Sequence, residues 1–334
     1  AVLLARRILD AISEPYLLEG HSVVIGASIG IAMSPGDGED SEKLLKSADM
    51  ALSRAKSDFR GTFSFFEAEM DARAQSRRKI EIDLRDAIQN EGLQPYYQPL
   101  VDLSSGRITG LEALVRWPHP ERGMISPGEF IPVAEETGLI NPLGSLMLHR
   151  ACMDAAQWPD DVRVAVNLSP LQFRTGNLLA LVTDALRQSG LPARRLELEI
   201  TETLLLEKSS QVLATLHALR ALGVRMSMDD FGTGYSSLSY LRSFPFDKIK
   251  IDRSFVKDLA RRADCLAIVR AISGLGRSLK ITTTAEGVET TDQLDWLRAE
   301  GCNEVQGFLF SAAKPGSEIA GLLSKFAERA SKAA

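Results

Sequence analysis

Short strand patterns alternate with helical patterns along most of this 334-residue chain, and this rhythm restricts the possible folds more than any other feature. From about residue 81 onward, apolar residues with a two-residue period predict eight strands. These strands are Gln94–Val101, Ile108–Trp117, Val162–Leu168, Leu196–Ile200, Val224–Met228, Lys248–Ile251, Ile281–Ala285 and a short one near Val305. Helical periodicity lies between most of them. About eight strands with helical crossovers over about 250 residues are typical of a TIM-type (β/α)8 barrel.

The first two predicted strands are joined by a very short connection, from Asp102 to Arg107. Parallel neighbours need a crossover of about a dozen residues or more, whereas antiparallel neighbours can be joined by a tight turn. We therefore predict an α/β fold, a modified TIM barrel whose first strand is antiparallel.

The first 66 residues have a separate pattern of helix, strand, helix and strand. A segment of this length is short for burying a hydrophobic core of its own. We interpret it as part of an α/β domain. The charged stretch from 67 to 91 is predicted as a solvated connecting helix. The predicted domains are residues 1–66, a linker helix over 67–80 and the barrel over 81–331. The expected elements of the first segment are a helix over Ala5–Ile12, a strand over Val23–Ala32, a helix capped by Ser41 and a strand over Phe63–Phe66.

Composition and charge exclude several classes of protein. Hydrophobic residues make up 45% and charged residues 25%, as in ordinary globular proteins. The net charge of −5 argues against a groove for a nucleic-acid polymer. No signal peptide is visible, and the longest nearly uncharged apolar stretch, Ser22–Met33, is too short to span a bilayer. We expect a cytoplasmic location, with any membrane anchor of a full-length protein in regions outside this sequence.

The cysteines and histidines restrict any metal site to oxygen ligands. Cys152, Cys265 and Cys302 are too widely spaced for a zinc site or a disulfide framework. The four histidines are also scattered, without an H-x-x-x-H pair. Any bound metal should therefore be a hard ion such as Mg²⁺, Mn²⁺ or Ca²⁺.

Polar residues recur on one parity of five predicted strands and end, at the carboxyl side, in an acid, an amide or a lysine. A single acid at a strand end is typical of a helix cap or a solvated loop, but a barrel brings consecutive strand ends together. Converging acids repel each other unless cations lie between them. The residues alone indicate a metal-dependent hydrolase or lyase, with a two-acid glycosidase as the alternative. The strand-end residues are Asn167, Glu199, Asp229 with Asp230, Lys250 with Asp252, and Glu286.

A series of short motifs follows the same strands in a fixed order. It resembles the EAL family of bacterial cyclic-di-GMP phosphodiesterases, covers about residues 81–331 and implies a TIM-like barrel with an antiparallel first strand. The motifs are Tyr97-Gln98-Pro99, Glu112-Ala113-Leu114-Val115-Arg116-Trp117, Val166-Asn167-Leu168-Ser169, Glu199-Ile200-Thr201-Glu202, Asp229-Asp230-Phe231-Gly232-Thr233-Gly234, Lys250-Ile251-Asp252, Ala285-Glu286-Gly287-Val288-Glu289 and Gln306-Gly307-Phe308.

The resemblance implies a two-metal site for Mg²⁺ or Mn²⁺, with Ca²⁺ inhibitory. Asp229 would bridge the two ions, with Asp230 on the second ion and Glu286 acting through water. Lys250 would orient the attacking water or offset charge on the phosphate, and Lys250 and Glu286 are the implied catalytic residues. The first ion would be held by Glu112, Asn167, Glu199 and Asp229.

Other matched positions are implied to bind substrate or to couple the site to a dimer. The substrate would be cyclic di-GMP, hydrolysed to linear 5′-pGpG in bacterial second-messenger signalling. Glu202, Phe231, Gly232 and Gly234 match a loop that couples metal binding to homodimer formation through the EAL domain, although Phe231 is also typical of a packing residue. The substrate-binding positions are Gln98, Leu114, Arg116, Glu289, Gln306 and Phe308.

Residues 1–66 resemble the C-terminal part of a GGDEF, or diguanylate cyclase, domain. The resemblance rests on the segments Ala27–Ala32, Ala48–Leu52 and Ala55-Lys56. Ala1–Leu4 resembles the strand that follows the family's GGDEF turn, and the turn itself is not in this chain. The resemblance implies GTP as a partner of this domain in an intact protein.

Two further functions stay open besides the phosphodiesterase. The barrel could be a non-hydrolysing receptor for cyclic di-GMP, or a signalling element read out through dimerisation. Receptors of that kind typically lose acids from the metal set. Here every implied metal position and Lys250 are filled, which favours the enzyme.

Overall fold

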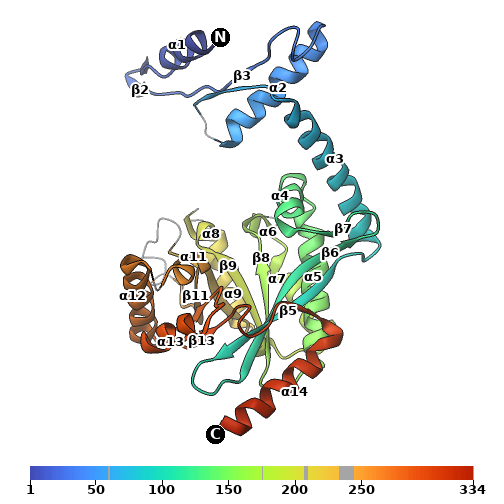
Figure 1. The fold of residues 1–334 in the computed structure, drawn as a ribbon, viewed down its shortest axis with the longest axis vertical. Coiled ribbons are helices and arrows are strands. Elements are labelled where there is room, and N and C mark those ends of the chain that lie inside the picture. The colour runs from blue at the N-terminus through green and yellow to red at the C-terminus, as the bar shows by residue number, and fades with distance from the viewer. Residues whose placement is uncertain (59–60, 175, 207–209, 233–243, 260, 334) are drawn as a thin grey trace. The chain divides into compact units, whose positions relative to one another are not determined.

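The computed structural model describes residues 1–58, 61–174, 176–206, 210–232, 244–259 and 261–333 (Figure 1). The chain divides into two compact units, Ala1–Asp83 and Leu84–Ala334. The boundary lies within one helix, α3 (Ala68–Gln89), which corresponds to the predicted connecting helix. No helix in the described ranges is long and apolar enough to cross a membrane.

The first unit contains two small two-stranded sheets and its helices. One sheet is an antiparallel hairpin of β1 and β2, and in the other β3 runs parallel to β4. The elements that precede α3 are α1 (Val2–Ile12), β1 (Tyr16–Leu18), β2 (His21–Val23), β3 (Ile29–Ile31), α2 (Ser41–Asp58) and β4 (Phe63–Phe65).

Three expectations for this unit are wrong. The first four residues are not a strand, because α1 begins at Val2 and its buried residues, Ala5 and Leu9, are spaced by one helical turn. The single strand expected from 23 to 32 is interrupted, since residues 24–28 have no strand partner. Ser41 lies inside α2; the carboxylate of Asp40 instead accepts a hydrogen bond from the backbone N–H of Lys43 at 2.8 Å, as an N-cap does.

The second unit alternates strands and helices as expected. Its elements are β5 (Gln94–Asp102), β6 (Ile108–His119), β7 (Gly123–Ile125), α4 (Pro127–Thr137), α5 (Ile140–Ala155), β8 (Arg163–Leu168), α6 (Pro170–Arg174), α7 (Leu178–Ser189), the 3-10 helix η1 (Ala193–Arg195), β9 (Leu196–Thr201), α8 (Glu202–Leu206), α9 (Ser210–Ala221), β10 (Arg225–Phe231), β11 (Lys248–Ile251), α11 (Arg253–Lys257), α12 (Ala263–Leu279), β12 (Thr282–Ala285), α13 (Thr291–Ala299), β13 (Glu304–Val305), β14 (Lys314–Pro315) and α14 (Gly316–Ala333).

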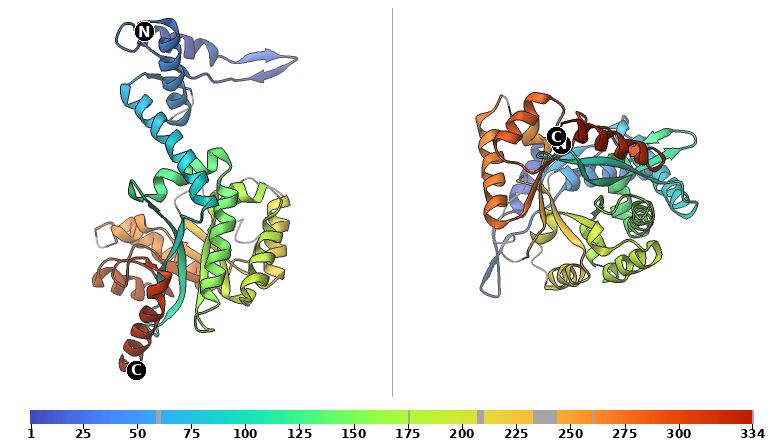
Figure 2. Two further views of the ribbon diagram at one scale, coloured as in Figure 1. Left: turned by 90° about the vertical axis from the view of Figure 1, so that its right-hand side faces the viewer. Right: turned by 90° about the horizontal axis from the view of Figure 1, so that it is seen from below.

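Within the described residues, eight strands close into a barrel in the order β5-β6-β8-β9-β10-β11-β12-β13. Pairing of β13 with β5 completes the ring. β5 is antiparallel to both of its barrel neighbours, and the other neighbouring strands are parallel. Helices surround the strands (Figure 2). The predicted modified TIM barrel with an antiparallel first strand is confirmed.

Apolar and polar residues occupy opposite faces of the barrel strands. On β8 and β9, the buried side chains of Val164, Val166, Leu196 and Leu198 belong to the hydrophobic core shared with the surrounding helices. The alternate positions carry acids, amides and lysines. Because side chains of a strand alternate between faces, the apolar core lies outside the barrel and a polar layer fills its interior.

A β-bulge changes the end of β10. The register with β11 shifts between Met228 and Phe231, and Asp230 has a left-handed backbone with a φ of 53°. Asp tolerates this conformation better than most residues, and a bulge redirects the side chains beside it. As a result Asp229 and Asp230, although consecutive, both line the cavity described next.

Candidate functional site

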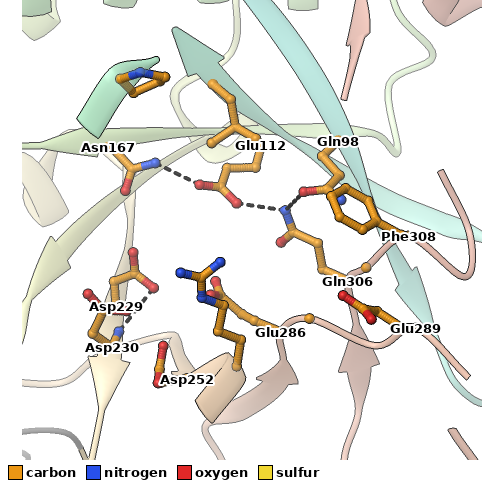
Figure 3. Close-up of a pocket in the computed structure, with 15 residues that line it drawn as sticks. Gln98, Glu112, Asn167, Asp229, Asp230, Asp252, Glu286, Glu289, Gln306 and Phe308 are labelled. Carbon is orange, nitrogen blue, oxygen red and sulfur yellow. Dashed lines mark hydrogen bonds between the residues drawn. The ribbon is translucent and has the colours of Figure 1, made fainter. Parts of the chain in front are cut away.

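A cavity of about 790 Å³ lies where the barrel strands end (Figure 3). Six carboxylates are among the described residues that line it, together with one amide on β8 and two glutamines. The lining residues are Gln98, Glu112, Leu114, Pro127, Asn167, Asp229, Asp230, Asp252, Arg253, Glu286, Gly287, Glu289, Gln306, Gly307 and Phe308. The cavity therefore collects residues from most of the strands that sequence analysis singled out.

Three of the acids are close enough to share one ion. Carboxylate oxygens of Asp229, Asp230 and Glu286 all lie within 4.8 Å of one another. On a neighbouring wall, the side-chain amide of Asn167 donates a hydrogen bond to Glu112 Oε1 at 2.7 Å. The registers of β6, β8 and β9 bring this pair beside Glu199, which is opposite Asn167 in the sheet.

Lys250 is buried beneath the cavity and neutralises part of this charge. Its Nζ lies 2.6 Å from Glu286, 2.7 Å from Glu199, 3.2 Å from Asp229 and 3.3 Å from Glu112. Burial alone would lower the pKa of Lys250, but the four carboxylates raise it well above its usual value. The lysine is therefore held as an ammonium ion.

One ammonium ion does not compensate four carboxylates. Burial and the neighbouring charge of Glu112 raise the pKa of Glu199 well above its usual value. Burial, followed by the charge of Asp229, raises the pKa of Asp230. Burial also raises the pKa of Glu286, to about 8, despite the opposing charge of Lys250. With every acid ionised, the site would hold more negative charge than Lys250 can balance, and these raised pKa values reflect that.

These residues suit a hard divalent cation. Their donor atoms are carboxylate and amide oxygens, which Mg²⁺ and Mn²⁺ prefer. Oε1 of Glu199 is buried and has no hydrogen-bond partner among the described residues. A buried carboxyl oxygen without a partner is costly, and a cation would supply one.

Gln306 connects the acidic wall to the first strand. Its side-chain nitrogen donates to Glu112 Oε2 at 2.7 Å and to Gln98 Oε1 at 3.0 Å. Gln98 in turn donates to the backbone carbonyl of Ser311 at 3.1 Å. A carboxylate can only accept, so the nitrogen of Gln306 must face Glu112, and this orientation places its oxygen elsewhere. That oxygen is buried and has no hydrogen-bond partner among the described residues.

The other predicted substrate positions are divided between two cavities. Phe308 is 69% exposed and lines the acidic cavity with Glu289, on the side of Gln98 and Gln306 (Figure 3). Arg116 instead lines a smaller, more apolar cavity of about 310 Å³, and Leu114 lines both. The guanidinium of Arg116 donates to the carbonyl of Val115 at 2.9 Å.

The predicted coupling positions lie outside the described lining of the acidic cavity. Glu202 is buried at the start of α8, and Phe231 is buried at the end of β10. Gly232 has a φ of 98°, and a Cβ there would lie 3.1 Å from the ring of Phe255. Gly234 lies outside the described residues, so its placement is not tested.

Two charged lining residues, Asp252 and Arg253, are absent from the predicted catalytic, substrate-binding and metal-ligand positions. Asp252 follows β11 directly, caps α11 and accepts a hydrogen bond from the backbone N–H of Ser254 at 3.0 Å. Arg253 follows it and lines the cavity. Asp252 carried a signal, because it shares the parity of Lys250 at a strand end, whereas no pattern in the sequence marks Arg253.

A second buried charge network lies nearer the start of the same strands. Nζ of Lys248 is 2.7 Å from Glu197 and 2.9 Å from Glu304, and Arg163 lies 3.0 Å from Glu304. Burial alone would raise the pKa of Glu304, but Lys248, and after it Arg163, lower it to about 2. This network closes the barrel interior below the acidic cavity.

The sequence matches two domain families. The profile of the EAL domain matches residues 81–313, and that of the diguanylate cyclase, GGDEF domain matches residues 1–62. The bifunctional diguanylate cyclase/cyclic di-GMP phosphodiesterase MucR of Pseudomonas aeruginosa is 44% identical over 323 residues, which are 96% of this chain and 47% of MucR. The cyclic di-GMP phosphodiesterase NbdA of the same organism is 41% identical over 94% of this chain and 41% of its own length.

Solved structures have the same fold. The structure of the P. aeruginosa MucR phosphodiesterase in its c-di-GMP complex has a TM-score of 0.70 and 44% identity, covering 72% of this chain and 99% of that one. The EAL domain of Mycobacterium smegmatis DcpA has a TM-score of 0.61 and 36% identity, covering 70% of this chain and 98% of that one. The chain spans less than half the length of the curated relatives MucR and NbdA. Through its barrel, this chain belongs to the EAL domain family.

Proposed function

We propose that the barrel is a divalent-cation-dependent phosphodiesterase that hydrolyses cyclic di-GMP to linear 5′-pGpG. The observation that carries the proposal is the excess of carboxylates around Lys250 in the cavity of an EAL-family barrel. The names of MucR and NbdA, which include cyclic di-GMP phosphodiesterase activity, support the choice of substrate.

In the proposed site, the metal ligands are those that the family resemblance implies. Glu112, Asn167, Glu199 and Asp229 would hold one Mg²⁺ or Mn²⁺ ion, and Asp229 with Asp230 would hold a second. Two such ions supply positive charge to a phosphodiester and make water a better nucleophile near neutral pH. The contacts of Asn167 and Gln306 to Glu112 support this assignment, because such hydrogen bonds fix the orientation of a ligating carboxylate.

The remaining polar groups move protons and offset charge. A water molecule attacks the phosphorus, the bond from phosphorus to the 3′ oxygen breaks, and that oxygen leaves with a proton as the 3′ hydroxyl. Glu286 would take the proton of the attacking water, and its raised pKa supports a role as a base. The ammonium group of Lys250 would offset negative charge that accumulates on the phosphate oxygens.

The coupling and partner assignments belong to the same proposal. We propose that the chain forms a homodimer through the EAL domain, and that Glu202, Phe231, Gly232 and Gly234 link the metal site to it. The strained backbone at Asp230, beside Phe231, supports a connection between that segment and the metal site. GTP would bind the GGDEF part of the intact protein. The domain boundaries at 66/67 and 80/81 and a cytoplasmic location, which the three free cysteines suit, are proposed as well.

The test is turnover of cyclic di-GMP by wild type and by Asp229→Asn, followed by chromatography of the products in Mn²⁺. Loss of one shared ligand charge should reduce turnover at least about a hundredfold. Asp292→Asn is the control, because it removes an exposed carboxylate from the first turn of α13. Full turnover by Asp229→Asn would contradict the proposal. Tight binding without turnover by wild type would identify a receptor instead.

A further inference from the structure

One arginine at the acidic cavity has a charge that the described residues leave unpaired. Arg253 is exposed at the start of α11 and lines the cavity. Its guanidinium forms no hydrogen bond or ion pair with any residue in the described part of the chain. Six carboxylates line the same cavity, so an arginine that pairs with none of them is available for an anion from solution.

The proposed substrate requires such a cation. A cyclic dinucleotide has two phosphodiester groups with one negative charge each, and hydrolysis occurs at only one of them. The second group has to enter a cavity lined by carboxylates, which would repel it.

Neither Lys250 nor Arg116, the other nearby cations, is among the described residues that line the acidic cavity. Lys250 is buried and lies within 3.3 Å of four carboxylates. Arg116 lines the neighbouring cavity and donates to a backbone carbonyl. Among the described lining residues of the acidic cavity, Arg253 is the cation that remains.

Local structure holds the stem of Arg253 beside the reacting groups. The carboxylate of Asp252 caps the first turn of α11, because its Oδ1 accepts a hydrogen bond from the backbone N–H of Ser254. Gly287, next to Glu286, packs against the stem: a Cβ at Gly287 would lie 2.6 Å from Cβ of Arg253. Gly287 also has a φ of 68°, which favours glycine. The loop carrying Glu286 is thus shaped to admit the arginine side chain.

We propose that Arg253 binds the phosphodiester group of the substrate that is not being hydrolysed. A guanidinium group matches two phosphate oxygens through two parallel hydrogen bonds, which an ammonium group cannot reproduce. The inference rests on the proposed function for the identity of the substrate.

The test compares Arg253→Met, which keeps the stem, and Arg253→Lys, which keeps the charge, in steady-state hydrolysis of cyclic di-GMP. Arg253→Met should raise KM about tenfold or more and leave kcat within about twofold, because the contact binds substrate and transition state alike. The KM of Arg253→Lys should lie between the KM of Arg253→Met and that of wild type. Lys257→Met is the control, since it removes one exposed charge from the same helix and should leave KM unchanged.

Guanosine has no phosphate, so its use as a competitive inhibitor tests whether Arg253 contacts the phosphate or the base of the substrate. Its inhibition constant should be the same for wild type and Arg253→Met. A KM of Arg253→Met equal to that of wild type would overturn the inference, and so would equal weakening of guanosine and substrate. If wild type binds cyclic di-GMP without turnover, the proposed function fails. The dissociation constants of the same variants for cyclic di-GMP then test the inference. They should increase from wild type to Arg253→Lys to Arg253→Met.

Discussion

At the scale of single residues, the barrel interior is organised by two lysines on one strand. Lys248 and Lys250 are both fully buried, and each lies within 3 Å of two carboxylates. The lower network pairs Lys248 with Glu197 and Glu304, with Arg163 and Arg225 beside them. The upper network has one lysine for four acids, so negative charge is left over only where the cavity opens.

The lower network predicts a specific dependence of stability on pH. Lys248 and Arg163 lower the pKa of Glu304 from 4.5 to about 2, against the opposing effect of burial. A lowered pKa in the folded state stabilises the fold above pH 4.5, and that contribution is lost as pH falls from 4.5 towards 2. Wild type should exceed Glu304→Gln in free energy of unfolding by about 3 kcal/mol near pH 6, with the difference decreasing below pH about 4.5.

Denaturant unfolding of both proteins between pH 3 and 7 measures this difference. The matched control is Glu318→Gln, which removes an exposed acid that pairs with Lys314 at 2.9 Å. An exposed pair of this kind contributes about 0.5 kcal/mol or less. A difference for Glu304→Gln that stays constant down to pH 3 would contradict the role of the lowered pKa.

Residue patterns predicted part of the site and missed the rest for identifiable reasons. Strand parity and the family motifs predicted Glu112, Asn167, Asp229 and Glu286 as site residues, and all four line the cavity. Strict alternation would direct Asp229 and Asp230 to opposite faces, and only the bulge in β10 explains why both face the cavity. Arg253 lies on a helix start with no periodic signal, so only the three-dimensional structure places it at the cavity.

At the scale of elements, one close backbone contact aligns two loops of the site. The N–H of Val288 donates to the carbonyl of Gln306 at 3.0 Å, and the N–H of Leu309 donates to the carbonyl of Val288 at 3.0 Å. Gly307 lies between these bonds, and a Cβ there would be 2.1 Å from the Val288 oxygen. The contact holds the loop after β12, with Glu286 and Glu289, against the segment that carries Gln306 and Phe308.

Gly307→Ala should therefore separate these two loops. We expect a loss of about 1–3 kcal/mol in stability, as for other overpacked sites, and at least a tenfold loss in kcat/KM. Gly321→Ala is the control, because that glycine lies within α14 and a Cβ added there would meet no atom within 4 Å, so alanine should be neutral or stabilising. Thermal unfolding and steady-state kinetics measure both effects. Wild-type kcat/KM in Gly307→Ala would contradict the role of the contact.

Helices and strands were predictable from sequence where the periodicity of apolar residues matches the face that each element buries. Seven predicted barrel strands, from Gln94–Val101 to Ile281–Ala285, overlap the observed strands closely, because each has one apolar face against helices. The first unit was less predictable. The apolar residues at its start satisfy a strand or a helix, and the expected strand from 23 to 32 pairs only at its two ends.

At the scale of the whole molecule, the described lining residues of the acidic cavity all lie between Gln98 and Phe308. The barrel also closes on itself, through β13 and β5. Its chemistry should therefore be complete without the first unit. Residues 67–334 alone should fold and hydrolyse cyclic di-GMP within about threefold of the rate of the whole chain, since no lining group is removed.

Circular dichroism and turnover of the two proteins at equal concentration test this independence. Loss of turnover in a folded 67–334 fragment would show that the first unit contributes to the site. Loss of folding would contradict the domain boundary instead. Either result would place the functional unit across more of the chain than the barrel.

Product analysis with and without divalent cations tests the central claim most directly. Purified protein is incubated with cyclic di-GMP in Mg²⁺ or Mn²⁺, in excess EDTA, and in EDTA followed by excess Mn²⁺, and the nucleotides are separated by chromatography. The account predicts linear pGpG in Mg²⁺ or Mn²⁺, none in EDTA, and recovery when Mn²⁺ is restored, because the carboxylates around Lys250 need a cation to act on an anionic phosphodiester. Undiminished pGpG in EDTA, or intact cyclic di-GMP in every sample, would contradict it.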